Sequence, residues 1–217
     1  MSKKSIHRSD FAETMVNSGF MFLYMLIFSV LGVFFMFGGL NPWIELFIGL
    51  AFAVPVMIIY FYLGGQEGAR EFKRLNGISA DSAKSGAVKV PNIAKGLLYV
   101  LPYAVFSLLI AAVCWIADNQ VFKVILLMIF MPAAILGQAT GVIVYPREVV
   151  YDKGLETEYT VIEGATSGLS VFAVIAVFVV ISCVVFLAAY ARKIRQSRDT
   201  FNSFMSEIVM NEKFRNR

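Results

Sequence analysis

Apolar residues gather in five long runs, which polar and charged segments separate. The runs cover residues 19–39, 43–64, 97–117, 121–145 and 168–190, and none carries a charge at its centre. Because a helix of about 20 apolar residues crosses the hydrocarbon core of a bilayer, each run is long enough for one crossing. The pattern predicts an all-α polytopic membrane protein, a helical bundle with five transmembrane helices.

The segments between the runs predict how the bundle is organised. Residues 38–42 and 118–120 are links so short that the runs they join must lie antiparallel. We therefore expect a membrane domain over residues 19–190 that consists of two helical hairpins and a fifth helix. Around it lie an N-terminal arm (1–18), a basic linker (65–96), an acidic loop (146–163) and a basic amphipathic tail (191–217).

Local signals predict where several helices begin and end. Asp10 and Glu13 have the spacing of a capping box, so the first helix should begin near residue 10. The second helix should continue beyond the bilayer to Asn76, which precedes a glycine of the kind that ends helices. Pro91 suits the first turn of the third helix, where its missing N–H leaves no partner unsatisfied.

Two polar segments carry structural patterns of their own. Residues 149–162 are rich in β-branched and aromatic residues around a Lys-Gly turn, which predicts a small β-hairpin on the membrane surface. After Tyr190, apolar positions keep helical spacing among basic ones, so the tail is either a solvated helix or one that lies on anionic lipid or on another subunit. The basic residues predicted for that contact are Arg192, Lys193, Arg195 and Arg198.

Small residues recur four positions apart along and after the apolar runs. This spacing lets helix backbones approach closely in lipid, where helices associate through packing and hydrogen bonds. In the second run the small residues share a helix face with Glu45. The residues predicted to pack helices together are Gly49, Ala53, Gly64, Gly68, Gly137, Gly141, Gly164 and Gly168.

Glu45 is the main candidate for an ion-handling side chain, because ionisable groups inside a membrane are costly and usually functional. Its place three residues after Pro42 favours a simpler interpretation, a solvated carboxylate in the first turn of a helix. Lys123 is expected at the same membrane level, which predicts a contact between Glu45 and Lys123. Gln138 should hydrogen-bond to a neighbouring helix, or else coordinate a solute.

The end of the second run and the start of the third share a motif with other proteins. Residues 62–70 contain Gly64-x-x-x-Gly68-x-Arg70, and Pro102 enters the third run. In these features the chain resembles a group of small uncharacterised polytopic bacterial membrane proteins. The resemblance covers less than half of the chain, implies no activity, and does not extend to the fifth run or the tail.

Composition agrees with a membrane protein and excludes several kinds of site. Of the 217 residues 59% are hydrophobic and only 16% are charged, whereas about a quarter are charged in soluble domains. The net charge of +4 arises from bases spread over the polar segments, so nucleic-acid binding is not expected. With His7 the only histidine, and Cys114 and Cys183 isolated in apolar runs, no metal, cofactor or catalytic triad is expected.

The distribution of lysine and arginine predicts a cytoplasmic N-terminal arm and linker, because cytoplasmic segments are enriched in these residues. Five crossings leave 11 of these bases inside and the seven of the tail outside, with Lys123 in the fourth run not counted. If residues 121–145 entered and left on one face, broken at Pro132 and Gly137, the counts would be 16 inside and three outside, with Lys123 among the three. Since an uninterrupted apolar run usually spans the bilayer, five crossings are favoured and the re-entrant segment is the alternative.

No cluster of residues has the specificity of a catalytic motif. The sequence favours a non-enzymatic protein of the cell membrane, an accessory or structural subunit that associates with itself or with other membrane subunits through its glycine faces and its tail. The alternative is a small permease or channel-like transporter of an ion or small solute.

Overall fold

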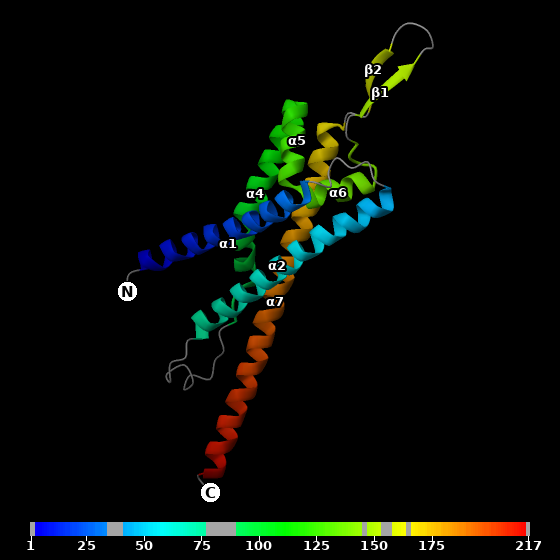
Figure 1. Cartoon of the computed structure of the whole chain (residues 1–217). Helices are drawn as coiled ribbons and strands as arrows, with labels where there is room; N and C mark the ends of the chain where they lie inside the picture. Colours follow the sequence, from blue (N-terminus) through cyan, green and yellow to red (C-terminus); the bar gives the residue numbers. More distant parts are fainter. Residues whose placement is uncertain are drawn as a thin grey trace. The chain divides into compact units, whose positions relative to one another are not determined.

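The computed structural model of the chain describes residues 3–33, 41–76, 90–144, 147–152, 158–163 and 166–215. Its helices are α1 (Lys3–Gly32), α2 (Pro42–Asn76), α4 (Ile93–Ala117), α5 (Gln120–Ile129), α6 (Met131–Ala139) and α7 (Gly168–Arg215) (Figure 1). Within the described residues α1, α2, α4 and α7 contain stretches long and apolar enough to cross a membrane, and the bent pair α5 and α6 would be a fifth if it counted as one span. These helices are consistent with a multi-pass membrane protein.

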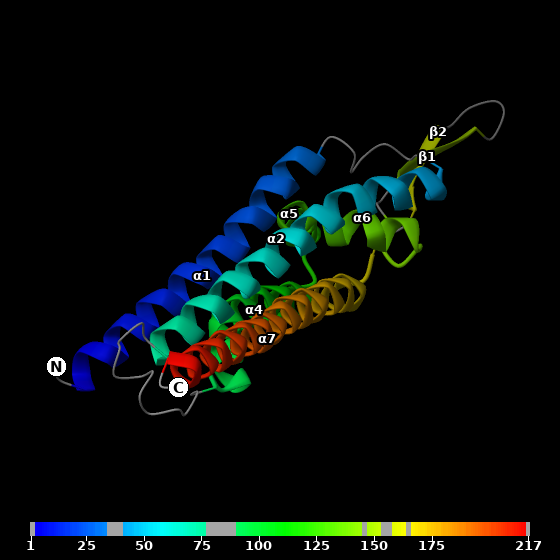
Figure 2. The ribbon, with the colours of Figure 1, turned by 90° about the horizontal axis from the view of Figure 1, so that it is seen from below.

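The fourth apolar run is not a continuous helix. α5 and α6 are separated by Phe130 and bent by 107° relative to each other (Figures 1 and 2). At 1.5 Å per residue, helices of 10 and nine residues are each about 15 Å long, half of the bilayer core. The break precedes Pro132, which lies in the first turn of α6 where its missing N–H is tolerated, whereas a continuous helix would be kinked there.

Helix α1 satisfies the backbone at this break. The Ser29 hydroxyl donates to the Ile129 carbonyl at 2.6 Å and accepts from the Met131 N–H at 3.3 Å. Phe22, also on α1, packs edge-on against Phe130 with ring centroids 6.4 Å apart. Non-helical backbone at membrane depth persists only where protein or a water-filled cavity satisfies its polar groups, and Ser29 meets this requirement.

We expect Ser29→Ala to destabilise the protein by about 1–3 kcal/mol, because it removes the partner of two backbone groups at the break. Thermal unfolding in detergent measures the loss. Ser107→Ala is the matched control, since Ser107 is buried in α4 and its hydroxyl has no hydrogen-bond partner among the described residues. Equal losses in the two variants would show that Ser29 does not hold the break.

The chain divides into two compact units, and each of the four long helices contributes to both. The terminal unit comprises Met1–Ser18, Ile58–Pro102 and Ser182–Arg217. The central unit comprises Gly19–Met57 and Tyr103–Ile181. The terminal unit therefore brings together the start of α1, the end of α2, the start of α4 and the end of α7.

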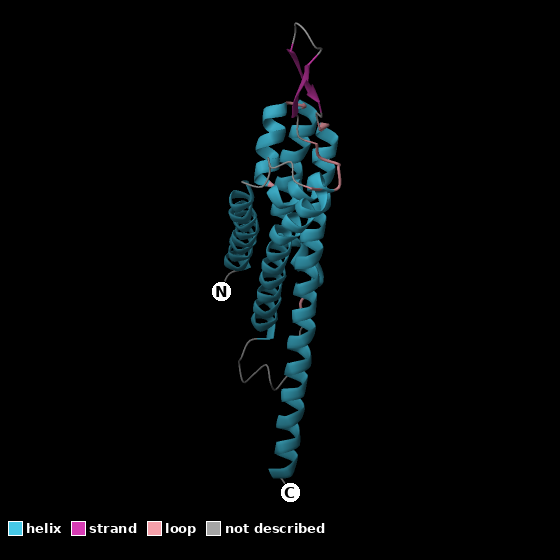
Figure 3. Cartoon of the chain, turned by 45° about the vertical axis from the view of Figure 1, so that its right-hand side comes forward, coloured by secondary structure: helices cyan, strands magenta, loops and turns pink. Residues whose placement is uncertain are grey.

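A two-stranded antiparallel sheet interrupts the helical fold. β1 (Arg147–Asp152) pairs with β2 (Glu158–Glu163), with Arg147 opposite Glu163 and Asp152 opposite Glu158 (Figure 3). The hairpin predicted over residues 149–162 is thus confirmed. The fold is otherwise helical among the described residues, as the sequence predicted.

Two predicted helix starts were wrong. α1 begins at Lys3 rather than near residue 10, since no proline or glycine precedes Asp10 to stop the helix from extending. α4 begins at Ile93 because the Asn92 side chain accepts the Ala94 N–H at 2.9 Å, which leaves Pro91 outside the helix. α2 does continue to Asn76, and the glycine after it lies outside the described residues.

Candidate functional site: a buried carboxylate pair and a basic groove

In the terminal unit α2 and α7 approach each other closely at two glycines of α2. A Cβ on Gly64 would clash with the backbone carbonyl of Phe186, and a Cβ on Gly68 would lie 2.6 Å from the carbonyl oxygen of Tyr190. Backbone atoms cannot move aside as the tip of a flexible side chain can. This Gly-x-x-x-Gly pair therefore packs two helices of the same chain against each other.

The other small residues predicted to pack helices have varied surroundings. Gly141 follows the end of α6 with φ +73°, and nothing lies within 4 Å of its Cβ position, so it serves a turn rather than a helix face. Gly164 lies outside the described residues. The remaining positions are buried within the central unit, namely Gly49, Ala53, Gly137 and Gly168.

The most unusual polar feature of the terminal unit is a pair of buried carboxylates. Glu67 and Glu71 lie one turn apart on α2 and are only 4% and 3% exposed. Sequence reasoning missed them, because acids that follow an apolar run are usually solvated. The signal that could have found them is the helical spacing that places them beside Gly64 and Gly68.

Basic side chains compensate this carboxylate pair. Glu67 Oε1 accepts from Arg70 Nη1 at 2.7 Å, and Glu71 Oε1 accepts from Arg74 at 3.2 Å. Lys95 Nζ, at the start of α4, donates to Glu71 Oε1 at 2.7 Å and so links α4 to α2. Removing one partner of a buried ion pair is destabilising because it leaves a charge uncompensated.

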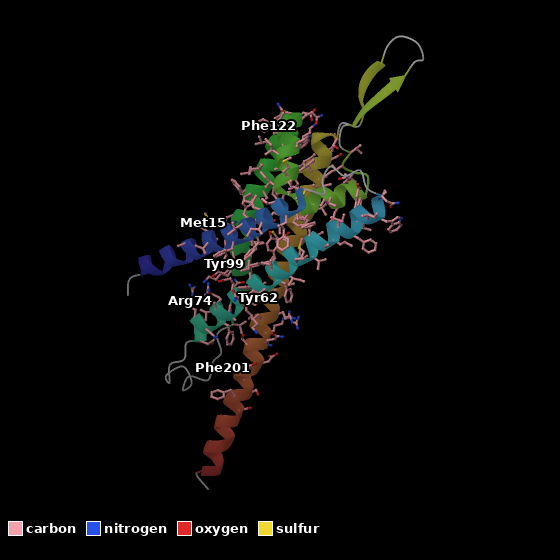
Figure 4. The ribbon with its side chains drawn as sticks, in the orientation of Figure 1. Met15, Tyr62, Arg74, Tyr99, Phe122 and Phe201 are labelled. Atoms are coloured by element: carbon pink, nitrogen blue, oxygen red, sulfur yellow. The ribbon has the colours of Figure 1, made fainter. Side chains whose placement is uncertain are left out.

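Tyrosines of two helices enclose the carboxylates. Tyr99 of α4 directs its hydroxyl at Glu71 Oε2, 3.5 Å away, and Figure 4 shows it near Arg74. The ring of Tyr190, on α7, lies 6.2 Å from that of Tyr99. Ser18 of α1 donates to the Tyr99 carbonyl at 2.8 Å. Residues of all four long helices thus lie around the two carboxylates, and their contacts can stabilise the packing of these helices in the terminal unit.

The expected contact between Glu45 and Lys123 is not formed. In the central unit Glu45 Oε1 accepts from Gln138 Nε2 at 2.8 Å. Lys123 is buried and bonds to Asp118 Oδ1 at 2.7 Å and to the Thr166 carbonyl at 3.0 Å. The prediction failed because it assumed a straight helix over residues 121–145, whereas the bend brings α6 rather than the start of α5 to Glu45.

The Lys123 contact affects the titration of Asp118, which lies between α4 and α5. The hydrogen bond and the charge of Lys123 hold the pKa of the Asp118 carboxyl below its ordinary value of 3.8. A carboxylate with a lowered pKa stabilises the fold above its unfolded pKa and loses this contribution as the pH falls through the folded pKa. The pair should therefore persist throughout the neutral range.

A groove of about 550 Å³ lies between α2 and α7 within the terminal unit. Ile58, Phe61 and Tyr62 form its apolar part. Gln66, Arg192 and Lys193 are among the residues of its polar part. Of the four basic tail residues singled out in the sequence, Arg192 and Lys193 line this groove, whereas Arg195 and Arg198 are exposed outside it.

The candidate site thus consists of the carboxylate pair and the groove between α2 and α7. Comparison of the chain with protein-family models, with curated proteins and with solved structures finds no match. Among the described residues, no group of three or more His, Cys, Asp and Glu side chains is placed to hold a metal ion. The carboxylate cluster and the groove are the polar features that the terminal unit brings together.

Proposed function

We propose that the chain is a non-enzymatic integral membrane protein, an accessory or structural subunit that binds its partner through the C-terminal part of α7. This segment, residues 191–215, is called the arm below. The sequence predicted an accessory role with contact through the glycine faces and the tail, and the present proposal keeps only the tail. Gly64 and Gly68 already pack against α7, so their face is not free to bind another subunit.

The observation that carries the proposal is the length of α7. It is one unbroken helix of 48 residues (Figure 3) and is about 72 Å long. A helix of about 30 Å is long enough to cross the hydrocarbon core of a bilayer. Its apolar stretch ends near Tyr190, so the arm extends beyond the membrane. Isolated helices are marginally stable in water, and most helices owe their stability to packing of one face.

The arm is anchored at its base and exposed further along. Ile194 is buried, and the ring of Phe201 packs against Phe72 of α2 with centroids 6.3 Å apart. Phe204, less than one turn beyond Phe201, is 59% exposed. An exposed aromatic side chain on a projecting helix is well suited to a partner surface, because aromatic residues are enriched at interfaces.

We also propose that α5 and α6 form a re-entrant segment, so that the chain crosses the membrane four times. Lys95, at the start of α4, and Phe201, in the arm, contact neighbouring positions at the end of α2. The arm would therefore lie on the same side of the membrane as the linker. Five crossings would put them on opposite sides, whereas four crossings make the N-terminal arm, the linker and the C-terminal arm all cytoplasmic.

We expect Phe204→Ser to reduce recovery of a stoichiometric partner in native co-purification at least tenfold with little change in Tm, because Phe204 is 59% exposed and loses little packing within the chain. Asn202→Ser is the control, since Asn202 is an exposed residue of the same turn. Recovery that is identical for both variants would exclude Phe204 from the interface. Recovery of the chain only as an isolated oligomer would contradict the accessory role.

The alternative is a small permease or channel-like protein, and the Glu45–Gln138 pair favours it. Discontinuous helices with polar groups near their ends hold ions or substrates in transporters. For this alternative, Glu45→Gln should abolish solute- or proton-dependent flux in proteoliposomes while Tm is retained. Flux in the wild-type chain that Glu45→Gln abolishes would favour transport over the accessory role.

A further inference from the structure

We propose that the groove between α2 and α7 binds one anionic phospholipid, with an acyl chain in its apolar part and the phosphate beside its two basic residues. The groove includes the first residues of the arm, Arg192 and Lys193, whereas the proposed partner surface lies at Phe204. The inference therefore holds whether or not the arm binds a partner.

The apolar part of the groove lies at a depth that suits an acyl chain. Ile58, Phe61 and Tyr62 are exposed large side chains near the end of the second apolar run. Figure 4 shows Tyr62 on α2. Gly65 lies beside them, and nothing occurs within 4 Å of its Cβ position. The missing side chain leaves space that continues from the apolar part toward the polar part.

The polar part of the groove is complementary to a phosphate. Arg192 and Lys193 are its charged residues, and the residues that line the groove include no acid. The nearby acid Glu67 is buried and paired with Arg70. The guanidinium carbon of Arg192 lies 5.9 Å from the ring centroid of Phe61, which holds the charge at the boundary between the two parts. Guanidinium groups bind phosphate oxygens through paired hydrogen bonds.

The position of the groove relative to the bilayer favours a lipid over a soluble anion or a second copy of the chain. The bases follow the apolar stretch of α7 directly, at the level where headgroups begin. Basic residues at this level attract anionic lipids. The groove volume of about 550 Å³ lies in the range of small-molecule pockets, which is enough for a headgroup and part of one chain. A soluble anion would not need the apolar part, and a second copy would bring its own bases to the same place.

The test is native mass spectrometry of the full-length chain in detergent, titrated with phosphatidylglycerol or with phosphatidylcholine of the same acyl chains. We expect one molecule of phosphatidylglycerol to be retained in preference to phosphatidylcholine. The double variant Arg192→Gln/Lys193→Gln should reduce this preference about 30-fold, because each basic residue near a membrane surface contributes about 1 kcal/mol. Arg195→Gln is the control, because Arg195 is exposed on α7 outside the groove.

A second variant tests the groove without changing its charge. The Cβ added by Gly65→Leu meets nothing within 4 Å, and the larger side chain should occupy space in the groove, so the variant should reduce phosphatidylglycerol binding at least tenfold while Tm is maintained. Equal retention of the two lipids, or equal effects of the double variant and Arg195→Gln, would overturn the proposal. Competition by glycerol 3-phosphate at the same concentration as the lipid would indicate a soluble anion instead. Loss of a dimer in Gly65→Leu without loss of lipid would indicate a second copy.

Discussion

Gly64→Leu is expected to prevent the chain from reaching its native state in detergent or lipid. The added Cβ would clash with the backbone carbonyl of Phe186, and backbone atoms cannot move aside without moving the helix. Fitting it requires α2 and α7 to separate along the terminal unit. We expect a loss of more than about 3 kcal/mol, the upper range for overpacking in a well-packed core.

The measurement for Gly64→Leu is the fraction of monodisperse protein after extraction, together with Tm. Gly65→Leu is the matched control, because it introduces the same side chain at the next position of the same helix, where the Cβ meets nothing within 4 Å. Gly68→Leu should resemble Gly64→Leu, since its Cβ would lie 2.6 Å from the Tyr190 carbonyl oxygen. If Gly64→Leu and Gly65→Leu gave the same yield and Tm, close packing of α2 on α7 would be wrong.

The elements that could be predicted from the sequence are those set by local composition. Apolar runs identify α1, α2, α4 and α7 because lipid requires long apolar helices. The β-hairpin was predictable because β-branched residues flank a turn signal. The spacing of Gly64 and Gly68 predicts a close helix approach, but spacing alone does not say whether the partner helix belongs to the same chain or to another.

The elements that could not be predicted depend on contacts between distant residues. Hydropathy measures how apolar residues 121–145 are, not whether they form one helix. The backbone at the break bonds to Ser29, about one hundred positions away, which local composition does not reveal. The predicted contact between Glu45 and Lys123 was wrong for the same reason, because the bend brings Gln138 to Glu45 instead. Helical spacing could have placed Glu67 and Glu71 beside the glycines of α2, but the contacts of Glu71 with Lys95 and Tyr99 could not be predicted, because these two residues follow the linker.

A re-entrant segment formed by α5 and α6, as proposed, would also remove a disagreement within the sequence. With five crossings the tail, with seven bases, lies outside, against the usual excess of lysine and arginine in the cytoplasm. With four crossings the tail joins the N-terminal arm and the linker. The contact of Phe201 with Phe72 supports the same arrangement independently, because it uses side-chain packing rather than charge.

Single cysteines are expected to react with a membrane-impermeant maleimide in intact cells at position 157 only. The substitutions are Ser82→Cys, Thr157→Cys and Ser206→Cys, each in a background that lacks Cys114 and Cys183. Four crossings with cytoplasmic termini leave residue 157 outside and residues 82 and 206 inside. Permeabilised cells are the control, since all three positions should then become labelled.

The other outcomes of the labelling each exclude a part of the proposed arrangement. Labelling at position 206 only would establish five crossings, and the Phe72–Phe201 contact would then be wrong, because the two rings could not meet across a bilayer. Labelling at position 82 would reverse the orientation. The experiment therefore tests the proposed four crossings and the packing of the arm on α2 together, because only an even number of crossings would leave residues 82 and 206 on the same side of the membrane.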